Sequence, residues 1–337
     1  MSIFGEDAAE RRPQEFALGL HHLDGLVPAA ARGAAEPGVL ADLGARLCDR
    51  SDELYDAGPI RGAALDGNRL TFDSPLPSDD PEVGTASARL FRAPRDQGRV
   101  VVVIPQWNAD AGSMVPACRI LNRFGLSALR LTLPYHEERR PPRMQRADAM
   151  VSPVLGLTLQ AVRRAVLEVR QAVGWLRAQG YRHVGMLGTS LGSCVGFLAL
   201  SHDEGIEAAA FNHVAGDFAD VVWSGLATRH VRESLEGHVD IETLRRCWAP
   251  ISPVHFAHRL AATRPSMLLI SGAYDPIFLP EHSRTLVDAL RRAGVGFQRA
   301  VLPCGHYTLG RPPFYLIDAF LVVRFFRRRL GGGRSTA

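Results

Sequence analysis

From Asn68 onwards, the apolar residues fall into short runs of the length that β-strands have. Residues 70–74 and 85–93 alternate between apolar and polar positions, and the turn-rich segment PLPSDDPEVG lies between them, which predicts a β-hairpin at one edge of a sheet. Residues 99–104, RVVVVI, form an unbroken apolar run, which is typical of a strand covered on both faces. The pattern therefore predicts a sheet with a buried centre.

Helical and strand-like segments alternate through the rest of the chain. Strands are predicted at residues 127–133, 183–187, 206–214, 266–271 and 297–302. Helices are predicted at residues 113–124, 157–179, 281–293 and 315–330, and in the segment that ends at Leu200. This alternation predicts an α/β fold with a doubly wound, mostly parallel sheet and helices on both faces.

Two stretches interrupt the alternation. Residues 134–153 are polar and rich in proline, which predicts an exposed loop near the carboxyl edge of the sheet. Residues 216–260 have helical character between two strands and predict a small helical lid. The expected organisation is an N-terminal helical extension over residues 1–66, an α/β domain over residues 67–330, and a disordered tail over residues 331–337.

Composition narrows the class of protein. The 337 residues are 46% hydrophobic and 22% charged, enough for a large core, and the net charge of +4 gives no reason to expect nucleic acid as a partner. The five cysteines are widely spaced and contain no C-x-x-C pair, so neither a disulfide framework nor a zinc site is predicted. No secretory signal or long apolar segment is visible, and a cytoplasmic location is expected.

The segment HVGMLGTSLGS carries the strongest chemical signal. An apolar strand, residues 183–187, leads through Gly188-Thr189-Ser190-Leu191-Gly192 into an apolar helix, the order that a nucleophile elbow requires. Glycines on either side of Ser190 allow the sharp turn, because they lack the Cβ atoms that would collide with the strand and helix. Ser190 is therefore the candidate nucleophile.

A serine nucleophile needs a base and an acid, which must follow later strands at the same sheet edge. Asp275 follows the strand SMLLIS, and His306 follows the strand FQRAVL, which gives the chain order Ser, Asp, His. Asp217 is the rival acid. Rival bases, none of which begins the loop between the last strand and the last helix, are His202, His213, His255, His258 and His282.

Acyl transfer also needs two N–H donors for the oxyanion. The backbone N–H of Leu191, directly after the nucleophile, is one candidate. The loop after RVVVVI supplies the other, and we expect the N–H of Trp107, with Gln106 as the alternative. If Trp107 is only a wall of the cleft, no complete oxyanion hole exists in the resting state.

Ser190-Leu191-Gly192, the loop with Asp275 and the pair Gly305-His306 make residues 99–330 resemble the α/β-hydrolase superfamily. The segments SPVHFAHRL and PSMLLISGAYDPIFLPEHSRTLVDALRRAG are similar to dienelactone-hydrolase and prolyl-oligopeptidase-like esterases. The run LTLPYHEERRPPRM, a long helix and GTSLGS resemble the branch called α/β-hydrolase domain-containing protein 18. Superfamily members usually have His-Gly where this chain has Pro105-Gln106, which puts the oxyanion loop in question.

Three further features have alternative interpretations. The arginines at 139, 140 and 143 either recognise an acidic head group or belong to a solvated loop, which we favour. The last helix either touches a membrane or packs on the sheet, which we favour. His21 and His22 have no third ligand at a suitable spacing, so no metal site is expected there.

Together these features predict a carboxylesterase-like serine hydrolase that cleaves a small-molecule or lipid ester, or a thioester, without a metal or organic cofactor. One alternative is a binding protein that kept the fold and lost turnover. Another is an acyltransferase that uses the same triad. No feature of the sequence specifies an oligomeric state.

Overall fold

The computed structural model describes residues 11–23, 25–28 and 36–331. The tail that was expected to be disordered lies outside these residues, apart from Gly331, and so do residues 1–10 of the expected extension. Within the described residues, one sheet of nine strands has the order β1-β2-β3-β5-β4-β6-β7-β8-β9. The strands are β1 Ala64–Asp66, β2 Arg69–Asp73, β3 Thr85–Phe91, β4 Arg99–Ile104, β5 Ser127–Thr132, β6 His183–Thr189, β7 Ala208–Asn212, β8 Ser266–Gly272 and β9 Gln298–Leu302.

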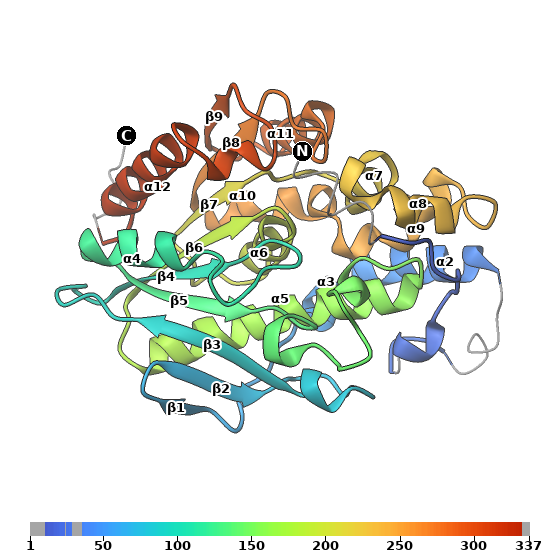
Figure 1. Cartoon of the computed structure of the whole chain (residues 1–337), viewed down its shortest axis with the longest axis horizontal. Helices are drawn as coiled ribbons and strands as arrows, with labels where there is room; N and C mark the ends of the chain where they lie inside the picture. The colour runs from blue at the N-terminus through green and yellow to red at the C-terminus, as the bar shows by residue number, and fades with distance from the viewer. Residues whose placement is uncertain (1–10, 24, 29–35, 332–337) are drawn as a thin grey trace.

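The predicted mostly parallel α/β sheet is confirmed. β4 to β9 pair in parallel, whereas β1, β2 and β3 pair antiparallel with one another and β3 pairs antiparallel with β5. The expected hairpin is the pair β2 and β3, and β1 lies outside it at the edge of the sheet (Figure 1). β1 consists of three residues inside the segment expected to form the extension, and a run that short has no recognisable period.

Helices cover both faces of the sheet because its central strands are apolar on both sides. In β4, Val100 and Val102 belong to one buried cluster and Val101 and Val103 to the other. The first cluster includes residues of α5 (Leu155–Ala178), α6 (Leu191–Ser201) and α11 (Pro280–Arg292). The second includes residues of α4 (Val115–Arg123) and α12 (Phe314–Arg329), which lie together on the other face (Figure 1).

The N-terminal helix α2 packs against the segment that was predicted to form a lid. α2 (Pro37–Asp49) contacts α9 (Ile241–Cys247) so closely that a Cβ atom on Gly44 would lie 2.2 Å from the carbonyl oxygen of Arg246. Helix α3 (Ser51–Leu54) contacts α2, and α7 (Phe218–Ser224) contacts both α9 and α8 (Arg229–Leu235). Helix α10 (Leu260–Thr263) precedes β8. Short 3-10 helices are η1 Leu20–Leu23, η3 Pro81–Val83, η4 Glu137–Arg139, η5 Asp148–Met150, η6 Leu226–Thr228, η7 Ala249–Ile251, η8 Pro253–Arg259 and η9 Thr308–Gly310.

The prediction that residues 134–153 are an exposed loop is wrong, because much of this segment is buried. Tyr135, His136 and Arg139 are buried, and the guanidinium of Arg139 forms two hydrogen bonds of 2.6 and 2.7 Å to the carboxylate of Glu168. Arg139 also donates to the carbonyl oxygen of Thr132 at 2.8 Å. A buried bidentate pair satisfies the charge, so Arg139 cannot face a ligand head group.

The last helix packs on the sheet, as predicted. Val322, Val323 and Phe326 of α12 are buried against strands of the second cluster. Its first turns leave Leu316 and Phe320 exposed. In the described part of the chain, no helix combines the length and the apolar character needed to cross a membrane.

Candidate active site

Ser190 occupies a strained turn between β6 and α6. Its φ of 54° and ψ of −120° lie in a region of backbone conformation that residues other than glycine rarely adopt. The turn closes because Gly188 and Gly192 lack side chains. A Cβ on Gly188 would lie 2.4 Å from the carbonyl oxygen of Gly192, and a Cβ on Gly192 would lie 2.3 Å from that of Ile104. The sequence segment thus folds as the predicted elbow.

The structure brings Ser190, His306 and Asp275 together. The Ser190 hydroxyl lies 3.1 Å from Nε2 of His306, and Nδ1 of His306 lies 2.9 Å from Oδ2 of Asp275. His306 follows β9 and Asp275 follows β8, so parallel strands deliver both side chains to the edge where β6 presents the serine. With the Nδ1 proton held by the carboxylate, Nε2 is free to accept the serine proton.

Asp275 is held by donors on both of its oxygens. Oδ1 accepts the backbone N–H groups of Ile277 and Phe278, each at 2.9 Å. Oδ2 faces Nδ1 of His306 and also Nδ1 of His213, at 2.8 Å. Burial opposes ionisation, but the contacts from His213 and His306 outweigh it and hold the pKa of Asp275 well below its usual range. The carboxylate is therefore charged at neutral pH.

The rival acid and bases occupy other positions. Asp217 accepts the N–H of Ala219 at 2.8 Å as the N-cap of α7, where burial raises its pKa to about 6. His202 bonds to the carbonyl oxygen of Leu198, and His282 bonds to the hydroxyl of Ser224. Among the rivals, His213 contacts Asp275, and its ring lies 4.4 Å from that of His306, centroid to centroid.

The serine opens into a cavity of about 880 Å³. Phe218, Val221 and Val222 of α7, in the segment predicted to form a lid, make up one apolar part of the wall. A second apolar part comes from α4 and α12, with side chains at Ala117, Ile120, Leu121, Val322 and Val323. The volume and the mostly apolar lining suit a small organic ligand. Leu191 and Trp107, the expected oxyanion donors, line the same cavity as Ser190.

The loop after β4 lies directly against the nucleophile helix. The carbonyl oxygens of Ile104 and Pro105 approach Gly192 so closely that no side chain would fit there. Asn108 takes the left-handed conformation, with a φ of 57°, and its N–H donates to Nε2 of His136 at 2.9 Å. The indole N–H of Trp107 donates to the carbonyl oxygen of Ala147 at 2.9 Å. The loop without the usual glycine is therefore held by contacts to residues 134–153.

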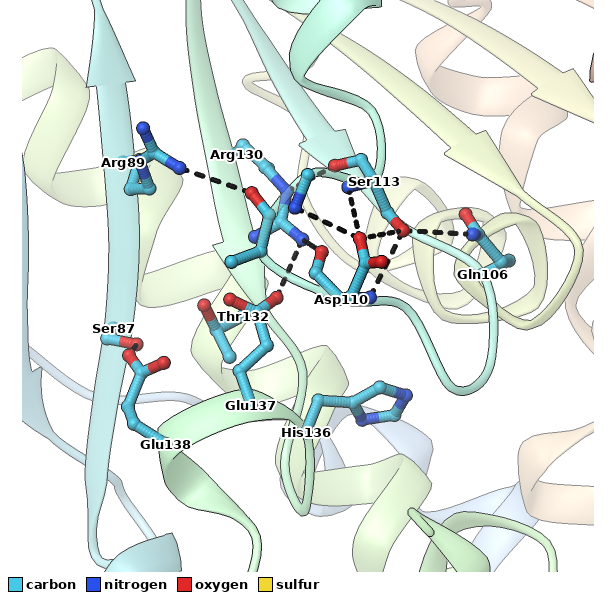
Figure 2. Close-up of polar contacts among 12 residues, drawn as sticks. Ser87, Arg89, Gln106, Asp110, Ser113, Arg130, Thr132, His136, Glu137 and Glu138 are labelled. Atoms are coloured by element: carbon cyan, nitrogen blue, oxygen red, sulfur yellow. Dashed lines mark hydrogen bonds and ion pairs between the residues drawn. The ribbon is translucent and has the colours of Figure 1, made fainter.

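A buried arginine fixes the far end of this loop. Arg130 of β5 donates to the carbonyl oxygens of Ser113 and Asp110 and to the carboxylate of Glu137, each at 2.6 Å (Figure 2). Asp110 accepts from the N–H of Ser113 at 2.8 Å, which closes a tight turn. Gln106 reaches the hydroxyl of Ser113 at 3.4 Å (Figure 2). Figure 2 also shows His136 on the segment that carries Glu137.

His136 is neutral in this network. Burial lowers its pKa to about 4, the nearby Arg139 and Arg130 act in the same direction, and the bond to the carbonyl oxygen of Pro134 opposes them. Nδ1 lies 2.9 Å from that carbonyl oxygen and donates to it, which leaves Nε2 as the acceptor for Asn108. The imidazole thus bridges two turns at the carboxyl edge of the sheet.

In the described residues, one cluster has the composition of a metal site. The ligand atoms of His213, Asp275 and His306 lie within 4.8 Å of one another. These atoms form the hydrogen-bonded chain behind Ser190, so a metal ion here would displace the proton on His306 Nδ1. A metal ion and a working triad therefore exclude each other at this position.

Sequence reasoning did not single out Asn212 and Asp318, and it considered His213 only as a rival base, although all three residues line the cavity. The position of Asn212 and His213 could have been inferred, because β7 ends at the same edge of the sheet as β6 and β8. Asp318 had a weaker signal, a single acidic residue among the apolar positions that begin the last helix. His136 and Arg130 had no signal, because their partners are distant in the sequence or are backbone atoms.

Solved structures share this fold. An acylaminoacyl peptidase of Pyrococcus horikoshii matches with a TM-score of 0.59 and 14% identity over 73% of this chain and 40% of that one. A puromycin-hydrolyzing peptidase of Mycobacterium tuberculosis gives a TM-score of 0.59 at 15% identity, over 73% of this chain and 37% of that one. An esterase of Pyrococcus furiosus gives 0.53 at 14% identity, over 73% and 87%. The chain therefore has the α/β-hydrolase fold, and it spans less than half the length of either peptidase.

Comparisons of sequence do not identify a family for the whole chain. A family model described as GHMP kinases C terminal matches residues 135–214, which is 80 of the 337 residues and includes Ser190. No curated protein matches the chain. The assignment of the fold consequently comes from the structure.

Proposed function

We propose that the chain is a serine hydrolase that cleaves a carboxylic ester or thioester through an acyl-enzyme. Ser190 attacks the carbonyl carbon while His306 takes the hydroxyl proton at Nε2 and then gives it to the leaving group. Water, deprotonated by His306, releases the acid from Ser190. Asp275 keeps His306 in the required tautomer and stabilises the imidazolium that forms in each step.

The observation that carries this proposal is the hydrogen-bonded chain from Ser190 Oγ through His306 to Asp275, with distances of 3.1 and 2.9 Å. The strained backbone of Ser190 supports the same role, since such strain concentrates at functional sites. The names of the similar structures, two peptidases and an esterase, agree with a hydrolase of this class.

The backbone N–H groups of Leu191 and Trp107 are the proposed oxyanion donors. Leu191 is the first residue of α6, so its N–H has no partner within the helix and lies at the positive end of the helix dipole. Trp107 belongs to the loop that His136 and Arg130 hold against α6. Fixed donors of this kind lower the barrier because they need no rearrangement as the negative charge develops.

The test is hydrolysis of p-nitrophenyl butanoate and of the matching thioester by the full chain. An acyl-enzyme predicts a burst of p-nitrophenol stoichiometric with protein, and Ser190→Ala is expected to lose at least about 10³-fold in kcat/KM. Ser266→Ala removes a half-buried hydroxyl at the start of β8, at the end of the strands opposite to Ser190, and serves as the matched control. Turnover that survives in Ser190→Ala would refute the proposal.

The same assay separates hydrolysis from acyl transfer. With added butanol, a hydrolase is expected to release mainly butanoic acid, whereas an acyltransferase would divert the acyl group to butyl butanoate. A binding protein that lost turnover would show neither product above the rate of the Ser190→Ala variant.

A further inference from the structure

A polar group of three side chains lies in the cavity beside the triad. Asn212 ends β7, His213 follows it with a φ of 56°, and Asp318 projects from α12. Asn212 is 4% exposed and His213 is 1% exposed, and all three residues line the cavity that contains Ser190. The Nδ2 amide of Asn212 donates to Oδ2 of Asp318 at 3.1 Å, so two elements far apart in the sequence meet here.

Four buried atoms of this group have no hydrogen-bond partner among the described residues, namely Oδ1 of Asn212, Oδ1 of Asp318, and Nδ1 and Nε2 of His213. Nδ1 of His213 nevertheless lies 2.8 Å from Oδ2 of Asp275, and a proton on Nδ1 avoids two lone pairs that face each other. With the ring proton on Nδ1, Nε2 is an acceptor, as both oxygens are. Buried polar atoms without hydrogen-bond partners cost folding free energy. Three acceptors on residues of one cavity therefore favour a ligand that donates several hydrogen bonds.

The surroundings restrict the ligand further. The cavity that Asp318 lines is also lined by apolar side chains of α4 and α12, among them Ile120, Leu121 and Val322. A carboxylate in such a wall is poorly solvated, and burial accordingly raises the pKa of Asp318 to about 6, whereas Asn212 and His213 act in the opposite direction. A bound cation would stabilise the ionised form.

We propose that Asn212, His213 and Asp318 bind a primary ammonium group, so that the substrate of the proposed hydrolase is an ester or thioester with an amine on an otherwise apolar chain. An ammonium group has three N–H donors and one positive charge, which matches three acceptors of which one is anionic. A hydroxyl group supplies one donor and no charge, and leaves two acceptors unsatisfied. The substrate assignment rests on the proposed function, whereas the ammonium site itself does not.

Matched esters test the substrate class. The full chain is assayed with p-nitrophenyl 6-aminohexanoate against p-nitrophenyl heptanoate, and with the 3-aminopropanoate against the butanoate, pairs in which an ammonium replaces a methyl group. We expect kcat/KM to favour the amino ester at least about tenfold in one of the pairs, because a site that hydrogen-bonds a group rejects analogues that lack it. Asp318→Asn is expected to remove this preference, and Asp288→Asn, an exposed aspartate on α11, to keep it.

Direct binding tests the ammonium site without turnover. In Ser190→Ala, n-hexylamine is expected to raise Tm more than 1-hexanol at equal concentration, and Asp318→Asn in that background is expected to abolish the difference. Asp318→Ala provides a second variant if the first is unstable. Equal shifts for the two ligands, or a difference that survives both substitutions, would overturn the ammonium site.

The two proposals fail differently. If neither ester pair is cleaved and Ser190 is unreactive, the hydrolase proposal fails, and the hexylamine experiment still decides the ammonium site. If esters are cleaved but no amino ester is preferred, or Asp318→Asn keeps the preference, the substrate class is refuted and the hydrolase proposal stands.

Discussion

His213 places its Nδ1 atom 2.8 Å from Oδ2 of Asp275, the same carboxylate oxygen that faces His306. Two imidazoles therefore share one carboxylate, and burial lowers the pKa of His213, with His306 acting in the same direction. A neutral His213 adds a donor to Asp275 without adding a second positive charge beside His306. This geometry supports Asp275, and not Asp217, as the acid of the proposed triad.

Substituting the two candidate acids separates their roles. Asp275→Asn is expected to lower kcat by about 10³ to 10⁴, because an amide no longer holds the required tautomer of His306. Asp217→Asn is expected to change kcat less than about threefold, since asparagine caps a helix nearly as well as aspartate. The measurement is kcat with p-nitrophenyl butanoate, and a larger loss from the change at Asp217 would reverse the assignment.

Gly192 tests the contact between the nucleophile helix and the oxyanion loop. In Gly192→Ala the new Cβ would lie 2.3 Å from the carbonyl oxygen of Ile104 and 2.4 Å from that of Pro105, so the loop with Trp107 must shift. We expect a loss in kcat on the order of 10²-fold, the usual effect of losing one oxyanion donor. Gly174→Ala on α5 has open space around it and is the control. Unchanged kcat in folded Gly192→Ala would remove the loop from the mechanism.

The Arg130–Glu137 pair tests how the loop is anchored. Their side chains are 0% and 9% exposed, so Arg130→Met leaves a buried carboxylate without its partner and removes a donor from the carbonyl oxygens of Ser113 and Asp110. The expected loss in the free energy of unfolding is about 3–5 kcal/mol by urea denaturation. The double change with Glu137→Met is expected to cost less than the sum of the single changes.

A surface pair calibrates that experiment. Arg229 and Glu233 form an exposed pair on α8, and Arg229→Met is expected to cost less than about 1 kcal/mol. If Arg130→Met costs no more than Arg229→Met, the buried network does not hold the loop.

His136 predicts a loss of stability in mild acid. Its folded pKa of about 4 is below the value near 6.5 of an unfolded histidine, so protonation favours the unfolded chain. The contribution of the neutral His136 to the free energy of unfolding is fully present above about pH 6.5 and is lost as the pH falls toward 4. Between pH 7 and 4.5 this histidine accounts for about 2 kcal/mol.

Urea denaturation at the two pH values measures this difference. In His136→Gln the decrease in the free energy of unfolding between pH 7 and 4.5 is expected to be about 2 kcal/mol smaller than in the wild type. His258→Gln, at an exposed histidine, is the control. An identical decrease in wild type and His136→Gln would show that His136 is not buried in its neutral form.

The parts of the fold with strong local patterns were predictable. The apolar run RVVVVI forms β4 over the residues expected, and the order of strands puts Ser190, Asp275 and His306 at one edge. This works because the carboxyl ends of parallel strands share an edge, so order along the chain determines proximity. The glycines around Ser190 have a local steric role that a short motif expresses.

Long-range polar contacts were not predictable. Arg139 was predicted to belong to a solvated loop, but it is buried beside Glu168, which lies 29 residues away on α5. His213 was considered as a base, and its contact with Asp275 depends on the backbone turn at the end of β7. Asp318 meets Asn212 across 106 residues. A single sequence gives the charge of such residues but not their partners, and the partner decides what the charge does.

The most direct measurement is the site of labelling by a fluorophosphonate probe, found by mass spectrometry on the intact chain and its peptides. The account predicts one adduct per chain on Ser190, no adduct in Ser190→Ala, and wild-type labelling in Ser266→Ala. An unlabelled wild type, or equal labelling of the Ser190→Ala variant, would contradict it.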